Sequence, residues 1–228
     1  MADERALRLA RELEQRDAAL AASIAELAEL ERDVEWLRAR AEEVQALLDR
    51  LPAERVAAAA DVASAREELA VRQGALREAE AALAAAEGGR DEEAVAAARR
   101  GLVRARDAVS SAERKLARAE AAAAEVERSA DAARRETPEL EERARKVASR
   151  MRGVARVARA GAEDPGLTLA GVVDWAARAR ATLFVARGGL ETERERGVRE
   201  ANELGASVLG EPLVATSVAL VRRRLEES

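Results

Sequence analysis

Residues 76–102 read LREAEAALAAAEGGRDEEAVAAARRGL, and the Gly88-Gly89 pair inside this stretch decides the fold. Before the pair, leucine recurs every seven residues, as at Leu76 and Leu83. The repeat then loses its phase, because it resumes at Val95, twelve residues after Leu83. Two adjacent glycines are poor helix residues and good turn formers. The stretch therefore predicts two helices joined by a tight turn.

The seven-residue repeat extends outward from this turn in both directions. It runs back along the first arm to Ala6 and forward along the second arm to Ala158. A repeat of this length imposes a left-handed seam in which positions a and d face a partner helix. Pro52 and Pro138 fall inside the arms without shifting the phase. We therefore expect each arm to kink or restart at its proline while its seam stays on one side.

The two arms are predicted to fold onto each other as an antiparallel coiled coil. The first arm spans 3–87, the tip 88–91 and the second arm 92–161, which makes 1–161 one hairpin domain. Arms of roughly 75 residues at 1.5 Å per residue would be about 110 Å long. The expected fold class is all-α: a long antiparallel coiled-coil helical hairpin with a small C-terminal helical bundle at its base.

Charged residues at positions e and g predict how the arms are aligned. When the chain folds at the glycines, seven pairs of opposite charge face each other: Glu80–Arg99, Arg66–Glu113, Arg38–Glu141, Asp61–Lys115, Arg40–Glu136, Asp33–Arg143 and Glu26–Arg150. Sliding the arms by one heptad instead places Arg66 on Arg106 and Glu80 on Glu92. Each exposed pair contributes only ~0–1 kcal/mol, so the pairs select a register more than they stabilise the fold. The predicted register is defined to about half a heptad.

The C-terminal segment, 162–228, differs in pattern from the arms. Gly161–Gly166 is predicted to be a loop, followed by three short helices. The first begins near Thr168, a candidate N-cap, and ends at Gly188-Gly189. The second ends at Leu209, and the third starts at Gly210–Pro212. We expect these helices to pack on roughly the first 18 residues, which the hairpin register leaves without a partner.

Composition excludes several classes of function. The chain has 228 residues, of which 36% are charged and 1% aromatic, with no Cys, no His and a net charge of −5. Thiol chemistry, disulfides and histidine metal sites are therefore excluded, and the carboxylates lie on predicted solvated faces. We predict no enzymatic activity and no catalytic, cofactor-binding or metal-binding residues. The N-terminus lacks the pattern of a signal peptide, so a cytoplasmic protein is expected, and the Ala and Arg excess suggests a bacterial one.

A basic run in the second arm is one candidate site. It could contact phosphates or an acidic partner through Arg145, Lys146, Arg152, Arg156 and Arg159. The alternative is that the run is neutralised by the acidic stretch of the first arm that holds Glu26, Asp33 and Glu35. No aromatic residue is interleaved for base stacking, which favours that alternative.

Two groups of residues are candidate contacts for a protein partner. Trp36 lies outside the predicted seam, near Ala39 and Ala46, and these residues could form a second seam with another hairpin. The alternatives are that alanine is simply the best helix former and that Trp36 covers arginine side chains. Trp175 and Phe184, with Val185, are interpreted as the core of the C-terminal bundle, or else as an apolar groove for a partner helix.

These features favour a non-enzymatic structural or adaptor protein: a rigid helical spacer that associates with itself or with another protein. A homo-oligomer is expected, and neither nucleic acid nor membrane is an expected partner. A long hairpin followed by shorter helices resembles, in topology, the phage-shock/ESCRT-III class, which implies membrane association. However, residues 1–17 lack the bulky apolar face of that class's membrane-binding helix. An accessory role on DNA, like that of SMC-like coiled coils, is the third hypothesis.

Overall fold

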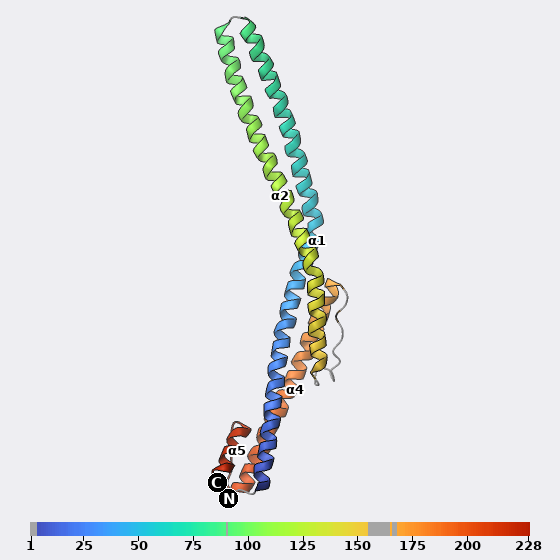
Figure 1. The fold of residues 1–228 in the computed structure, drawn as a ribbon, viewed down its shortest axis with the longest axis vertical. Coiled ribbons are helices and arrows are strands. Elements are labelled where there is room, and N and C mark those ends of the chain that lie inside the picture. Colours follow the sequence, from blue (N-terminus) through green and yellow to red (C-terminus); the bar gives the residue numbers. More distant parts are fainter. Residues whose placement is uncertain (1–3, 90, 155–164, 166–167) are drawn as a thin grey trace. The chain divides into compact units, whose positions relative to one another are not determined.

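The computed structural model describes residues 4–89, 91–154, 165 and 168–228, and this part of the chain is all-α, as predicted. Its helices are α1 (Glu4–Gly89), α2 (Glu92–Gly153), α4 (Leu169–Leu209) and α5 (Val218–Glu226), shown in Figure 1. The predicted end of the second arm at 161, most of the predicted Gly161–Gly166 loop, Arg156 and Arg159 lie outside the described residues.

The chain divides into two units. Val44–Glu136 forms one, called here the hairpin unit, and Met1–Glu43 with Thr137–Ser228 forms the other, called the bundle unit. Both α1 and α2 contribute to each unit. Pro52 lies inside α1 and Pro138 inside α2, and neither proline ends its helix. Neither arm therefore restarts at its proline.

In the hairpin unit α1 and α2 run side by side in opposite directions (Figure 1). The predicted turn is present, although α1 continues through Gly88 and Gly89. Asp91 begins α2, because its carboxylate accepts hydrogen bonds from the backbone N–H groups of Glu93 at 3.0 Å and Ala94 at 3.2 Å. This N-cap satisfies two of the free donors of the first helical turn.

The core of the hairpin unit follows the predicted seam. Its buried apolar residues all occupy predicted a or d positions: Val44, Leu51, Ala65, Leu102, Val109, Ala112, Ala130 and Ala133. Half of these side chains are alanines, which lets two helix axes approach more closely than the usual ~8–10 Å. The seam is therefore narrow and contains little apolar volume.

The register of the hairpin unit differs from the prediction by one heptad. Arg66 pairs with Glu120 at 2.9 Å rather than with Glu113, and Lys115 pairs with Glu68 at 2.6 Å rather than with Asp61. Arg99 likewise pairs with Glu87 at 3.4 Å instead of Glu80. The signs of these charges are compatible with both registers, because each of the three cations faces an acidic residue in either one.

In the bundle unit α4 runs antiparallel to the first part of α1. Ion pairs join Arg180 to Glu35 at 3.4 Å, Arg187 to Glu31 at 2.7 Å and Arg194 to Asp17 at 2.7 Å. The core is built from large side chains buried to 1% exposure or less: Leu27, Leu30, Leu37, Met151, Trp175 and Leu183. Thr168 caps α4 as predicted, since its hydroxyl accepts from the Gly171 N–H at 3.1 Å.

The prediction of three short C-terminal helices is wrong. α4 continues through Gly188-Gly189, and the described residues of this segment form two helices, α4 and α5. Two glycines cost about 2 kcal/mol of helix propensity relative to alanine. Burial of Ala186 and Leu190 on either side of the pair offsets that cost, because both side chains are at most 6% exposed.

The end of the chain packs on the beginning of α1, as predicted. Ala10 lies in one buried cluster with Ala201, Val218, Val221 and Leu225. α4 ends at Gly210, whose positive φ of 73° favours glycine and whose N–H donates to the Ala206 carbonyl.

α5 begins at Val218, later than the predicted start at Gly210–Pro212. The intervening backbone is held by Asn202, whose amide donates to the Ala215 carbonyl at 3.0 Å and accepts from its N–H at 2.7 Å. Ser217 then caps α5 by accepting from the Leu220 N–H. These side-chain hydrogen bonds replace the first helical turn that the sequence pattern predicted.

Candidate functional site

The basic run predicted in the second arm is engaged by carboxylates of the same chain. Arg145 pairs with Glu141 at 3.6 Å and Lys146 with Glu142 at 2.7 Å, each one helical turn away. The Lys146 hydrogen bond lowers the pKa of Glu142, which is the effect of a nearby cation on a carboxyl group. Arg152 is exposed. The geometry of Arg145 and Lys146 therefore agrees with the alternative of a neutralised surface.

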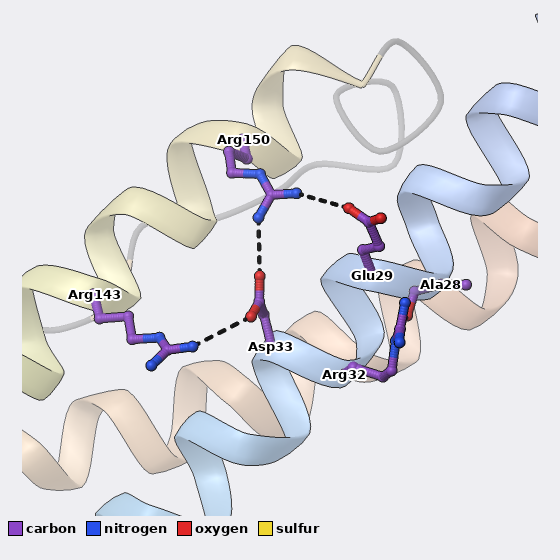
Figure 2. Close-up of polar contacts among 6 residues, drawn as sticks. All are labelled: Ala28, Glu29, Arg32, Asp33, Arg143 and Arg150. Carbon is purple, nitrogen blue, oxygen red and sulfur yellow. Dashed lines mark hydrogen bonds and ion pairs between the residues drawn. The ribbon is translucent and has the colours of Figure 1, made fainter.

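Asp33 joins α1 to α2 at the centre of this region, as Figure 2 shows. Its carboxylate accepts from Arg150 at 2.9 Å and from Arg143 at 3.4 Å. Arg150 also reaches Glu29 at 3.6 Å. Of the seven predicted pairs, Asp33–Arg143 is confirmed here, whereas Arg150 binds Asp33 and Glu29 rather than Glu26.

Trp36 contacts an arginine side chain, in agreement with the alternative interpretation that it covers arginines. The guanidinium of Arg143 lies over its ring, 4.0 Å from the centroid, and the residue remains 45% exposed. A cation–π contact at an exposed site contributes ~0.5–1 kcal/mol. Ala39 and Ala46 are exposed as well, Ala39 in the bundle unit and Ala46 in the hairpin unit. Their proposed contact with another hairpin stays a prediction.

Trp175 and Phe184 have opposite environments. Trp175 is 1% exposed and belongs to the core, as the first interpretation predicted. Phe184 is 69% exposed and Val185 68% exposed, so their assignment to the core is wrong. The inward positions of this turn are taken by Leu183 and Ala186, which leaves the two intervening residues on the solvent side of α4.

Phe184 belongs to an uncharged stripe along the solvent side of α4 that sequence reasoning did not identify. The stripe, called here the outer face of α4, consists of Ala170, Val173, Ala177, Ala181, Phe184 and Gly188. Its spacings of three and four residues place all six on one side of the helix, opposite the buried side. All six except the half-buried Val173 are exposed. The available signal was the absence of charge at six positions that share one face of the helix, in a chain that is 36% charged.

The pKa values and the distribution of acidic residues in the described part of the chain are those of a solvated helical surface. The perturbed pKa values belong to ion-paired surface groups: Lys115 lowers the pKa of Glu68, and Asp17 raises that of Arg194. Within the described ranges, acidic residues do not gather in a group of three or more that could hold a metal ion. In the same part of the chain, we find no helix with the length and apolarity needed to cross a membrane.

Comparison of the chain with protein-family models, with curated proteins and with solved structures found no match.

Proposed function

We propose that this chain is a non-enzymatic structural or adaptor protein of the cytoplasm, which serves as a helical spacer and associates with itself through the outer face of α4. The observation that carries the proposal is the uncharged, exposed character of that face. Contiguous apolar surface of this kind marks an interaction site more often than a freely solvated helix face.

Three arginines of α4 support this interpretation because they are directed toward α1. Arg180, Arg187 and Arg194 form ion pairs with carboxylates of α1. These contacts hold α4 against α1 and direct its charges toward that flank. Over residues 170–188 the opposite side of the helix is left with small residues and the strongly exposed Phe184, and beyond Gly188 the same side carries Glu195 and Arg199.

The outer face fits a second copy of the same chain. If two α4 helices pack antiparallel about a twofold axis, Phe184 of each copy can lie over Gly188 of the other. Within the described residues, a Cβ added at Gly188 would meet no atom within 4 Å, so the backbone there is open to a large side chain. The same alignment brings Arg180 close to Glu191 of the other copy, and both side chains are more than half exposed in one chain. Large-to-small packing with flanking opposite charges is the pattern of a helix–helix interface.

The hairpin unit supports the spacer part of the proposal. Its two helices are joined along the seam by ion pairs such as Arg55–Glu127 at 2.6 Å and Arg66–Glu120 at 2.9 Å. Paired long helices resist bending more than single ones and expose their side chains to partners along the entire surface. We infer that this unit holds its binding partners apart or presents them, and that it does not change them chemically.

The experiment is light scattering coupled to size-exclusion chromatography over a range of protein concentrations. We expect the wild-type protein to elute as a dimer. Phe184→Asp should raise the dimer dissociation constant by roughly 30-fold or more, as loss of a central aromatic anchor does.

The matched control is Val214→Asp, which places the same charge on another exposed apolar residue of the bundle unit, 93% exposed and outside the outer face. This variant should dimerise like the wild type. A wild-type protein that stays monomeric at all concentrations, or a dimer that Phe184→Asp leaves intact, would contradict self-association through α4. Circular dichroism of both variants verifies that the helices remain folded.

A further inference from the structure

We propose that the hairpin unit can occupy two coiled-coil registers one heptad apart, and that α2 can slide along α1 between them. One register is the structure described above. The other is displaced by seven residues, about 10 Å at 1.5 Å per residue. The inference does not depend on self-association through α4, because it concerns the pairing of α2 with α1. Since α2 is continuous through Pro138, the slide also moves its buried residues Leu140, Val147 and Met151.

Duplicated acidic partners are the first observation behind this inference. Arg66, Lys115 and Arg99 pair with Glu120, Glu68 and Glu87 in the structure. One heptad away, the same three cations would face Glu113, Asp61 and Glu80. Each cation therefore finds a carboxylate in either register, and the exposed ion pairs give little preference for one over the other.

The apolar seam is the second observation, because it is nearly the same after a shift of one heptad. In an antiparallel pair, a residues of one helix pack against d residues of the other. Along the seam of the hairpin unit the a positions carry Leu or Val except at Arg55, Ala123 and Ala130, and the d positions of both helices carry mostly Ala. At most layers a shift of seven residues again places a large side chain against an alanine, so steric fit gives little preference for one register.

The tip of the hairpin is the third observation. Gly88 and Gly89 are helical in the structure, yet a Cβ added at either would meet no atom of the described residues within 4 Å. No side-chain packing therefore holds the two glycines in the helix. In the shifted register α1 would end earlier and the two glycines would form the turn, for which their backbone freedom suits them.

The fourth observation is Asp33, in the bundle unit, which contacts one arginine that corresponds to each register. Its bond to Arg143 belongs to the shifted register, and its bond to Arg150 belongs to the register of the hairpin unit. Figure 2 shows the carboxylate between the two guanidinium groups, which lie one heptad apart on α2. A movement of α2 by seven residues would thus pass between two partners that Asp33 already contacts.

Two double variants with the same change in charge test the proposal. E68R/E87R puts like charges together in the observed register, at Lys115 and Arg99, and leaves Asp61–Lys115 and Glu80–Arg99 for the shifted one. D61R/E113R, the matched control, removes the partners of the shifted register only. The readout is the distance between spin labels on cysteines introduced at Ala60 and Ala96, both exposed, in a chain with no natural cysteine.

In E68R/E87R the distance between the labels should shorten by about 10 Å, with helical content by circular dichroism unchanged. In D61R/E113R the distance should equal that of the protein carrying only the labels. The proposal is overturned if E68R/E87R keeps the original distance, or if its arms separate and lose helicity instead of settling at the shorter distance. It is also overturned if both double variants shift alike, because the effect would then follow net charge and not register.

Discussion

At the scale of single residues, the chain uses the same dipeptide in two ways. Gly88-Gly89 is followed by the turn between α1 and α2, whereas Gly188-Gly189 lies in the middle of α4. The difference is in the surrounding pattern: the apolar repeat loses its phase at the first pair, but Leu183, Ala186 and Leu190 keep theirs through the second. Phase, and not glycine content, could have predicted both outcomes from the sequence.

Substituting glycines of α4 by alanine should change stability in opposite directions at two positions. Gly189→Ala should raise the free energy of unfolding by roughly 0.5–1 kcal/mol, because the site is helical, exposed, open and outside the outer face of α4. Gly205→Ala should lower it by roughly 1–3 kcal/mol, since the new Cβ would lie 2.5 Å from Leu213 Cδ2 and 3.1 Å from Val221 Cγ1.

Urea denaturation followed by circular dichroism measures both changes. Each variant is the control for the other, because the substitution and the helix are the same. Equal effects of the two substitutions would show that α4 and α5 do not approach as closely at Gly205 as described.

At the scale of the elements, the sequence predicted the seam but not its alignment. The heptads of α1 and α2 determine which side chains are buried, and the buried residues of the hairpin unit lie at the predicted positions. Register requires a feature that differs from one heptad to the next. Repeated carboxylates and a seam made mostly of Leu, Val and Ala supply few such features. Matching opposite charges therefore selected an alignment one heptad away from the one in the structure. The outer face of α4 was not predicted for a related reason. Apolar periodicity identifies the buried side of a helix, and it does not identify exposed positions that lack charge.

The Lys115–Glu68 bond between α1 and α2 should make the stability of the hairpin unit depend on pH. The hydrogen bond and charge of Lys115 hold the pKa of Glu68 below its ordinary value of 4.5. A carboxyl whose pKa is lower in the folded state stabilises that state at pH values above the unfolded pKa. This contribution is lost as the pH falls through the folded pKa of Glu68.

Glu68→Gln should therefore lower the midpoint of thermal unfolding at pH 7, and the difference from wild type should vanish in acid, at pH values below the lowered pKa of Glu68. Glu67→Gln, on the outward side of the same turn, is the control and should have a smaller effect at pH 7. A deficit of Glu68→Gln that persists unchanged at low pH would mean that the glutamine disturbs packing and that the ion pair is not its cause.

At the scale of the whole molecule, apolar volume is distributed unevenly between the units. Among the described residues, the largest side chains with under 2% exposure all belong to the bundle unit, including Trp175, Leu30 and Met151. Burial of a large apolar side chain contributes ~1.5–3 kcal/mol, whereas an alanine contributes much less. The hairpin unit, with its narrow seam, is therefore the less stable of the two.

Hydrogen exchange measured by mass spectrometry should show this difference directly. Amides of α1 within Val44–Gly89 and of α2 up to Glu136 should exchange faster than those of α1 before Glu43 and of α4. Local opening governs exchange, and its free energy follows the buried apolar contacts of each region. Uniform protection along the full length of α1 would contradict the assignment of two cores of unequal strength.

The placement of the aromatic side chains has a consequence for optical spectroscopy. Both tryptophans and the single phenylalanine lie in the bundle unit, and the chain has no tyrosine. The hairpin unit thus absorbs and emits nothing of its own in the near ultraviolet. Intrinsic fluorescence therefore follows the bundle unit alone, with the buried Trp175 expected to emit at shorter wavelength than the half-exposed Trp36. The fluorescence of a tryptophan introduced into the seam of the hairpin unit would have to be distinguished only from that of Trp36 and Trp175.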